Sequence, residues 1–200
     1  MATALDAAEP LIRLPDQYEV VGGEIVELPP MSFYAREVAN VLNAAIGRHL
    51  LTHDTGRNRL ELLFKIPLPE DQTRNRQPDA VYISYDRWPA DRPLPYTGNA
   101  LDVVPDLAVE VVSPGDSADD LLAKVREYIR GGVRLVWVVY PLAREIHAYL
   151  PGTGSIRVYS VADQLDAPDI LPGFSTPVAS LFPPTEPPST TLTGDALPTS

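Results

Sequence analysis

Cysteine is absent from the 200-residue chain, which excludes a disulfide scaffold, a thiolate zinc site and a cysteine nucleophile. No apolar run approaches the roughly 18 residues that a membrane-spanning helix needs. The first ten residues, MATALDAAEP, lack the basic and apolar regions of a signal peptide. We therefore expect a soluble cytoplasmic protein with no membrane partner.

Positive charge is scarce. Sixteen Lys and Arg residues stand against 27 Asp and Glu residues, so the net charge is −11 and the isoelectric point is near 4.6. A protein that holds nucleic acid by counterion release normally has a basic face, so any nucleic-acid binding here must be local, metal-assisted or weak. Only Lys65 and Lys124 are lysines, so each is a candidate for a role that arginine does not fill.

Several common catalytic motifs are also missing. The chain has no G-x-S-x-G elbow, no P-loop and no G-x-G-x-x-G fingerprint. The three histidines, His49, His53 and His147, lack the spacing and the acidic partner of a zinc hydrolase site.

The hydrophobic content of 44% is enough for the core of one domain. Residues 1–16 have no periodic pattern and are interpreted as an N-terminal arm. Residues 183–200, PPTEPPSTTLTGDALPTS, have too little apolar surface to offset the entropy of ordering and are predicted to be disordered. The folded domain is therefore predicted over residues 17–182.

The order of the predicted elements indicates an α/β or α+β fold around a mixed sheet. A β-hairpin is expected at 18–28 around Gly22-Gly23, because paired glycines favour a tight hairpin turn. Helices are expected from the cap Ser32 to about Leu50 and from the cap Ser117 to Arg130, where Gly131-Gly132 stops the second helix. Strands are expected at 59–68, 79–84, 107–113, 133–140, 144–150 and 155–160.

Glu110 is the most informative residue, since it is a lone carboxylate within the apolar strand LAVEVVS (107–113). An unpaired carboxylate is costly to bury, so Glu110 needs a cation, a metal or hydrogen-bond donors. Asp79 and Asp106 each follow a proline and open a strand, a position that is also typical of a turn. If adjacent strands bring Asp79 beside Glu110, the two carboxylates form a hard-oxygen site suited to Mg²⁺ or Mn²⁺.

Lys124 lies on the helix that follows the Glu110 strand. Two interpretations are open: a surface ion pair with Asp120 or Glu127, or an ammonium that positions an attacking water. Tyr128, one turn further on, either orients that ammonium or packs in the core. Glu24 and Glu37 are acidic groups within reach of such a site, but nothing in their spacing requires it.

The segments QPDAVYIS (77–84), PDLAVEVVSPGDSADDLLAKVREYIRGGVRLVWVVYP (105–141) and LPGFSTPVASLF (171–182) resemble the Uma-type family of "putative restriction endonucleases". This family is part of the PD-(D/E)xK nuclease superfamily. The hairpin sequence YEVVGGEIVELPP (18–30) resembles it as well, so the resemblance covers nearly the whole predicted domain.

The resemblance implies a restriction-endonuclease-like mixed β-sheet flanked by helices, with an N-terminal β-hairpin. It assigns Asp79 and Glu110 to the metal-binding carboxylates. The lysine expected two residues after Glu110 is replaced by Val112, and the resemblance assigns its role to Lys124 on the following helix. Two further positions depart from the family pattern: Tyr34 or Ala35 stands where a histidine often begins the first helix, and Tyr140 where an aspartate often ends the strand.

The implied activity is Mg²⁺- or Mn²⁺-dependent hydrolysis of DNA phosphodiester bonds, with Asp79, Glu110 and Lys124 as catalytic residues. Cleavage of both strands of a duplex would suit a two-fold homodimer. The acidic composition favours a second interpretation, a degenerate nuclease fold that serves as a non-catalytic DNA-binding or protein-interaction module.

Overall fold

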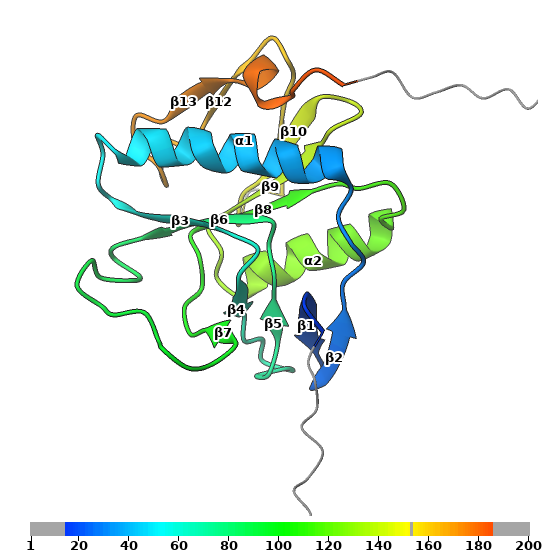
Figure 1. Cartoon of the computed structure of the whole chain (residues 1–200), viewed down its shortest axis with the longest axis vertical. Coiled ribbons are helices and arrows are strands. Elements are labelled where there is room, and N and C mark those ends of the chain that lie inside the picture. Colours follow the sequence, from blue (N-terminus) through cyan, green and yellow to red (C-terminus); the bar gives the residue numbers. More distant parts are fainter. Residues whose placement is uncertain (1–14, 153, 186–200) are drawn as a thin grey trace, which may run out of the picture.

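The computed structural model describes residues 15–152 and 154–185. Most of the arm predicted for residues 1–16 and of the tail predicted for residues 183–200 lies outside these described residues. A six-stranded mixed sheet forms the centre, with helix α1 (Phe33–Leu50) on one face and helix α2 (Ala118–Arg130) on the other (Figure 1). No helix of the described part is long and apolar enough to cross a membrane.

The central sheet has six strands, one of which carries Glu110. Its strands in spatial order are β11 (Ile156–Tyr159), β10 (Glu145–Tyr149), β9 (Leu135–Tyr140), β8 (Leu107–Val111), β6 (Ala80–Ser84) and β3 (Gly56–Leu60). Strands β8 and β9 are parallel and are joined through α2, whereas the other neighbours are antiparallel. The order of strands and helices thus agrees with the mixed sheet expected from the sequence.

A second, smaller sheet lies beside α2 and carries the N-terminal hairpin. Its strands in spatial order are β2 (Glu24–Glu27), β1 (Tyr18–Val21), β5 (Asn75–Arg76), β4 (Leu63–Lys65) and β7 (Ala100–Leu101). The hairpin turn has positive φ angles at Gly22 (61°) and Gly23 (83°), a conformation that glycine adopts without strain. A two-stranded sheet of β12 (Gln164–Asp166) and β13 (Ser175–Pro177) precedes a 3₁₀ helix, η1 (Val178–Leu181).

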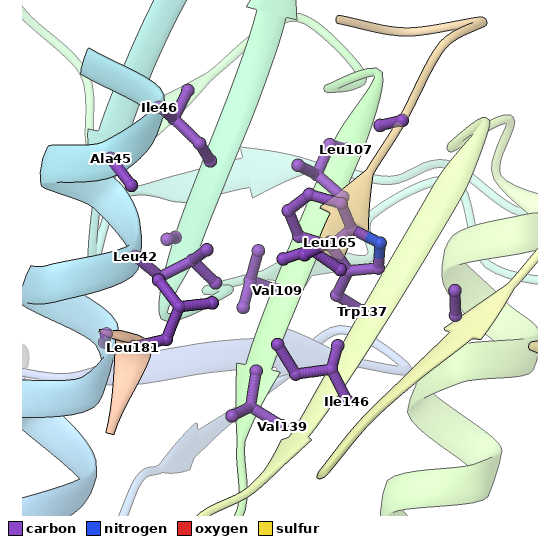
Figure 2. Packing of buried hydrophobic residues seen from close by; sticks show 14 of the residues in the cluster. Leu42, Ala45, Ile46, Leu107, Val109, Trp137, Val139, Ile146, Leu165 and Leu181 are labelled. Atoms are coloured by element: carbon purple, nitrogen blue, oxygen red, sulfur yellow. The ribbon is translucent and has the colours of Figure 1, made fainter. Parts of the chain in front are cut away.

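The two faces of the central sheet have separate cores. Leu42 and Ile46 of α1 pack with Val109, Trp137 and other buried apolar residues of the sheet (Figure 2). On the opposite face, α2 contributes Val125 and Tyr128 to a core with Ala108, Val136 and Val138. Successive residues of β8 therefore point alternately to α1 and to α2.

The single strand predicted for residues 59–68 is wrong. Strand β3 ends at Leu60 and pairs with β6, while β4 begins at Leu63 and pairs with β5 and β7 in the smaller sheet. Between them Glu61 has φ of 48°, so the chain changes direction and leaves one sheet for the other. The apolar pattern of the sequence continues past Glu61 because β3 and β4 both pack against a hydrophobic core.

Candidate active site

Asp79 directly precedes β6, and Glu110 lies on the neighbouring antiparallel strand β8. The register pairs Ala80 with Val109, and the backbone N–H of Asp79 donates to the carbonyl oxygen of Val109 at 3.0 Å. Oδ2 of Asp79 also accepts from the backbone N–H of Val111, two residues further along β8, so the two contacts of Asp79 flank Glu110. Both carboxylates line the same cleft as Lys124 of α2.

Asp79 is fixed by the strand that carries Glu110. Its Oδ2 accepts a hydrogen bond of 2.6 Å from the backbone N–H of Val111. Burial and, after it, the negative charge of Glu110 raise the pKa of Asp79 well above its ordinary value. The cleft therefore places two carboxyl groups close enough for one to oppose ionisation of the other.

Glu110 is 6% exposed, and both of its carboxylate oxygens have donors. Oε1 accepts a hydrogen bond of 2.6 Å from the Tyr128 hydroxyl, and Oε2 accepts one of 3.0 Å from Nζ of Lys124. Burial raises the pKa of Glu110, whereas the Lys124 ammonium lowers it by a smaller amount. The sequence predicts that Glu110 needs a partner in its apolar strand, and Lys124 and Tyr128 of α2 are these partners.

Lys124 occupies the centre of the charge arrangement. Its Nζ lies 3.0 Å from Glu110 and 3.1 Å from Oε1 of Glu19, and its side chain is only 18% exposed. Burial lowers the pKa of Lys124, but Glu110 and Glu19 raise it by more, so the ammonium stays charged. The partners that the described residues supply to this ammonium are thus buried carboxylates of the site, not Asp120 or Glu127.

The three residues line one open cleft of about 750 Å³, which we call the acidic cleft. The hairpin forms one wall through Val21, Val26 and Leu28, and the start of α2 forms another. The charged residues of its lining are the acids Glu19, Glu27, Glu61, Asp79, Glu110, Asp116, Asp120 and Glu127 and the bases Arg76 and Lys124. The cleft therefore attracts cations and repels anions.

The donor set of the cleft fits a hard divalent cation of the Mg²⁺ type. Among the described residues no group of three or more His, Cys, Asp or Glu side chains is arranged to hold a metal ion. Mg²⁺ is nevertheless commonly held by one or two carboxylates, its other ligands being waters and substrate phosphate oxygens. Burial and, after it, the charge of Glu110 raise the pKa of Asp79, and a bound divalent ion would favour the ionised form of both carboxyls.

Two residues of the site were missed or left open from the sequence. Glu19 is 2% exposed and binds Lys124, yet its place in a hairpin strand 105 positions earlier gives no sign of this contact. Tyr128, whose alternatives were orientation or packing, does both: it is fully buried and donates to Glu110. Lys124 and Tyr128 are four residues apart and therefore lie on the same face of α2. This spacing is the sequence signal that could have indicated that both contact Glu110.

Other acidic candidates lie elsewhere. Asp106 opens β8 at the end opposite Glu110, where it accepts a hydrogen bond from the backbone N–H of Ser84 at 2.7 Å and pairs with Arg87 at 3.0 Å. Asp106 thus ties strands and loops together, away from the cleft. Glu24 and Glu37 do not belong to the cleft lining.

The remaining lysine and the histidines are also outside the cleft. Lys65 forms an exposed ion pair with Asp102 at 3.2 Å. The rings of His49 and His53 stack with centroids 4.2 Å apart on the α1 side of the molecule.

Comparison with known proteins gives two findings. The model of the Uma2 family, described as "Putative restriction endonuclease", matches residues 8–179. Among solved structures, a "putative nuclease belonging to DUF820" from Anabaena variabilis ATCC 29413 is similar, with a TM-score of 0.69 and 17% sequence identity over 82% of this chain and 89% of that chain. At this identity the likeness shows a shared fold alone. No match is found among curated proteins.

Proposed function

Since the chain belongs to the Uma2 family of restriction-endonuclease-like proteins, we propose that it is a divalent-metal-dependent endonuclease that hydrolyses DNA phosphodiester bonds in the acidic cleft. One observation carries the proposal: the hydrogen bonds of Asp79 to Val109 and Val111 flank Glu110, and the Lys124 ammonium lies 3.0 Å from Glu110. Two carboxylates and an ammonium in an open cleft are the parts that metal-assisted phosphodiester hydrolysis requires.

Asp79 and Glu110 are the residues that would hold Mg²⁺ or Mn²⁺. When bound, such an ion supplies positive charge at the scissile phosphate and lowers the pKa of a bound water. Tyr128 and the Val111 N–H fix the orientation of the two carboxylates through hydrogen bonds of 2.6 Å each. Lys124 donates from its ammonium to orient the attacking water and to stabilise the charge that develops on the phosphate oxygens.

DNA is the partner that this proposal requires, and its binding is expected to be weak and metal-assisted. The cleft lining carries eight acids and two bases, and both bases already form ion pairs with acids of the lining. Positive charge for the phosphate therefore comes from the metal, not from a basic protein face. A homodimer would allow two such clefts to act on the two strands of a duplex.

The test compares plasmid nicking by the wild type, Asp79→Asn and Glu24→Gln in Mg²⁺ or Mn²⁺. The wild type should nick the plasmid only with a divalent ion. Asp79→Asn removes a metal ligand and should retain less than about 1% of the rate, since a metal ion supplies several kcal/mol of transition-state stabilisation and each 1.36 kcal/mol is tenfold. Glu24→Gln, an exposed carboxylate outside the cleft lining, is the matched control and should cleave like the wild type.

The second candidate function is a non-catalytic interaction module, and the surplus of acids in the cleft favours it. A module that binds basic protein segments would use Glu27, Asp116 and Asp120, whereas Glu61 already pairs with Arg36 at 2.7 Å. It predicts no nicking by the wild type and no effect of millimolar Mn²⁺ on the melting temperature. Calorimetry with Mn²⁺ beside the plasmid assay separates the two functions, because only the nuclease requires a ligand that binds and stabilises the folded state.

A further inference from the structure

Glu19 is buried at the point where three parts of the acidic cleft meet. It belongs to β1 of the hairpin, and 2% of its surface is exposed. Its Oε1 accepts a hydrogen bond of 3.1 Å from the backbone N–H of Gln77, two residues before Asp79. The same oxygen lies 3.1 Å from Nζ of Lys124. One carboxylate therefore links the segment that carries Asp79 to the ammonium beside Glu110.

The other oxygen of Glu19 is held by an arginine that is itself fixed. Arg76 pairs with Oε2 of Glu19 and donates from Nε to Glu127 at 2.8 Å. Glu127 also pairs with Arg74 at 2.5 Å. Because both oxygens of Glu19 have fixed partners, its side chain cannot turn away from Lys124 without breaking several buried contacts.

The position of Lys124 between two carboxylates matters because one of them is a proposed metal ligand. If Glu110 were its only partner, the ammonium would compete directly with a divalent ion for Oε2 of Glu110. Glu19 provides a second carboxylate at nearly the same distance, 3.1 Å against 3.0 Å. The ammonium can therefore release Glu110 and still remain in the cleft.

We propose that Glu19 is a positioning residue that retains the Lys124 ammonium in the acidic cleft while Glu110 binds the divalent ion. This role rests on the proposed nuclease function and adds to it a residue from the N-terminal hairpin. Glu19 acts through Lys124 and does not touch the metal. The hairpin therefore contributes to the function of the cleft, because Glu19 of its strand β1 determines the position of the Lys124 ammonium.

The test is a double-mutant cycle on Mn²⁺ affinity, measured by calorimetry on the full chain without DNA. Glu19→Gln leaves the ammonium to compete for Glu110, so Mn²⁺ binding should weaken about tenfold, the range typical of groups that orient metal ligands. Lys124→Ala removes the competitor and should bind Mn²⁺ at least as tightly as the wild type. The double variant should match Lys124→Ala within about twofold, because Glu19 has no ammonium left to position.

Asp106→Asn is the matched control for loss of structure. Asp106 is a buried carboxylate that precedes β8, but it lies outside the cleft lining and pairs with Arg87 at 3.0 Å. Its substitution should leave Mn²⁺ affinity within about twofold of the wild type. In the plasmid assay Glu19→Gln should lower kcat with little change in KM, since it misplaces a group that acts in the transition state.

The outcomes separate this inference from the proposed function. An equal loss of Mn²⁺ affinity for Glu19→Gln with and without Lys124 would make Glu19 a metal ligand and overturn the positioning role. Wild-type affinity and kcat in Glu19→Gln, with Mn²⁺ binding intact in the wild type, would overturn the inference alone. A wild type that binds no Mn²⁺ and nicks no plasmid would overturn the nuclease function itself.

Discussion

At the scale of single residues, the acidic pair is asymmetric. Glu110 has a cation and a hydroxyl as partners, whereas Asp79 has a backbone N–H and faces the charge of Glu110. Burial and that charge raise the pKa of Asp79, so ionising this carboxyl costs free energy in the metal-free folded protein. Glu110 also holds the buried Lys124 ammonium, whereas Asp79 has no ion pair among the described residues. Removing one charge or the other should therefore have opposite effects on stability.

We expect Asp79→Asn to stabilise the metal-free protein and Glu110→Gln to destabilise it. The asparagine oxygen can still accept from the Val111 N–H, and the loss of the charge should add about 1 kcal/mol, or about 2–4 °C in melting temperature. Glu110→Gln removes the negative charge that pairs with the buried Lys124 ammonium and should cost about 1–3 kcal/mol. Calorimetry at pH 7 without divalent ions measures both changes.

Mn²⁺ supplies the control for this pair of variants. It should raise the melting temperature of the wild type and leave that of Asp79→Asn unchanged, since a ligand stabilises only a folded state that binds it. A metal-free Asp79→Asn protein that melts below the wild type would show that Asp79 is well solvated and that the two carboxylates do not oppose each other.

The sequence singles out Glu110 but not its partners. A lone charge in LAVEVVS requires a partner, whereas Asp79 by itself is also typical of a turn and is assigned to the site by the family resemblance. The contact between Glu19 and Lys124 joins residues 105 positions apart through the packing of the hairpin on α2, which no local pattern encodes. The side-chain direction of Lys124 was for the same reason left open between surface and cleft.

At the scale of elements, the hairpin is attached to the rest of the site partly through the carboxylate of Asp71. Within the described residues β1 pairs with β5 through Val20 and Asn75, and Asp71 accepts hydrogen bonds from the Gly22 N–H and from Thr73. The Gly22 N–H, the Thr73 hydroxyl and Arg74 lower the pKa of Asp71 to about 2. The attachment of the hairpin is therefore sensitive to acid.

We expect a loss of stability as the pH falls from about 4 to about 2 that depends on Asp71. The folded state lowers the pKa of this carboxyl, so in that interval the unfolded state binds more protons, and acid favours unfolding. The contribution is fully present above the ordinary pKa of 3.8 and is lost as the pH falls through about 2. Asp71→Asn should show a smaller decrease in the free energy of unfolding, measured by urea denaturation at pH 4, 3 and 2.

Elements with local signals were predicted well, and an element that depends on partner strands was not. The caps Ser32 and Ser117 mark the two helix starts, and their hydroxyls accept from the N–H groups of Ala35 and Asp120. The corner at Glu61 could not be predicted, because the apolar pattern of residues 59–68 continues while the chain passes from one sheet to another. Pairing partners, not local propensity, decide where such a strand ends.

At the scale of the whole molecule, the negative net charge limits how strongly the protein can bind DNA. The net charge is −11, and the two bases of the cleft lining, Arg76 and Lys124, both form ion pairs there. An ordinary nucleic-acid-binding protein releases one set of counterions for each phosphate that a Lys or Arg neutralises. This molecule offers at most two such groups near its proposed site, so salt should affect its DNA binding little.

We therefore expect the affinity of Lys124→Ala for a duplex oligonucleotide in Mn²⁺ to fall with salt with a slope of magnitude below about 2 in a plot of log K against log salt concentration. This variant keeps both metal carboxylates and lacks the ammonium, so binding can be followed by fluorescence anisotropy without cleavage. Removing Mn²⁺ should abolish binding, because the acids of the cleft then face the phosphates alone. A slope of magnitude near 6 or more would mean that a basic surface outside the cleft holds the DNA, and metal-independent binding would favour the non-catalytic module.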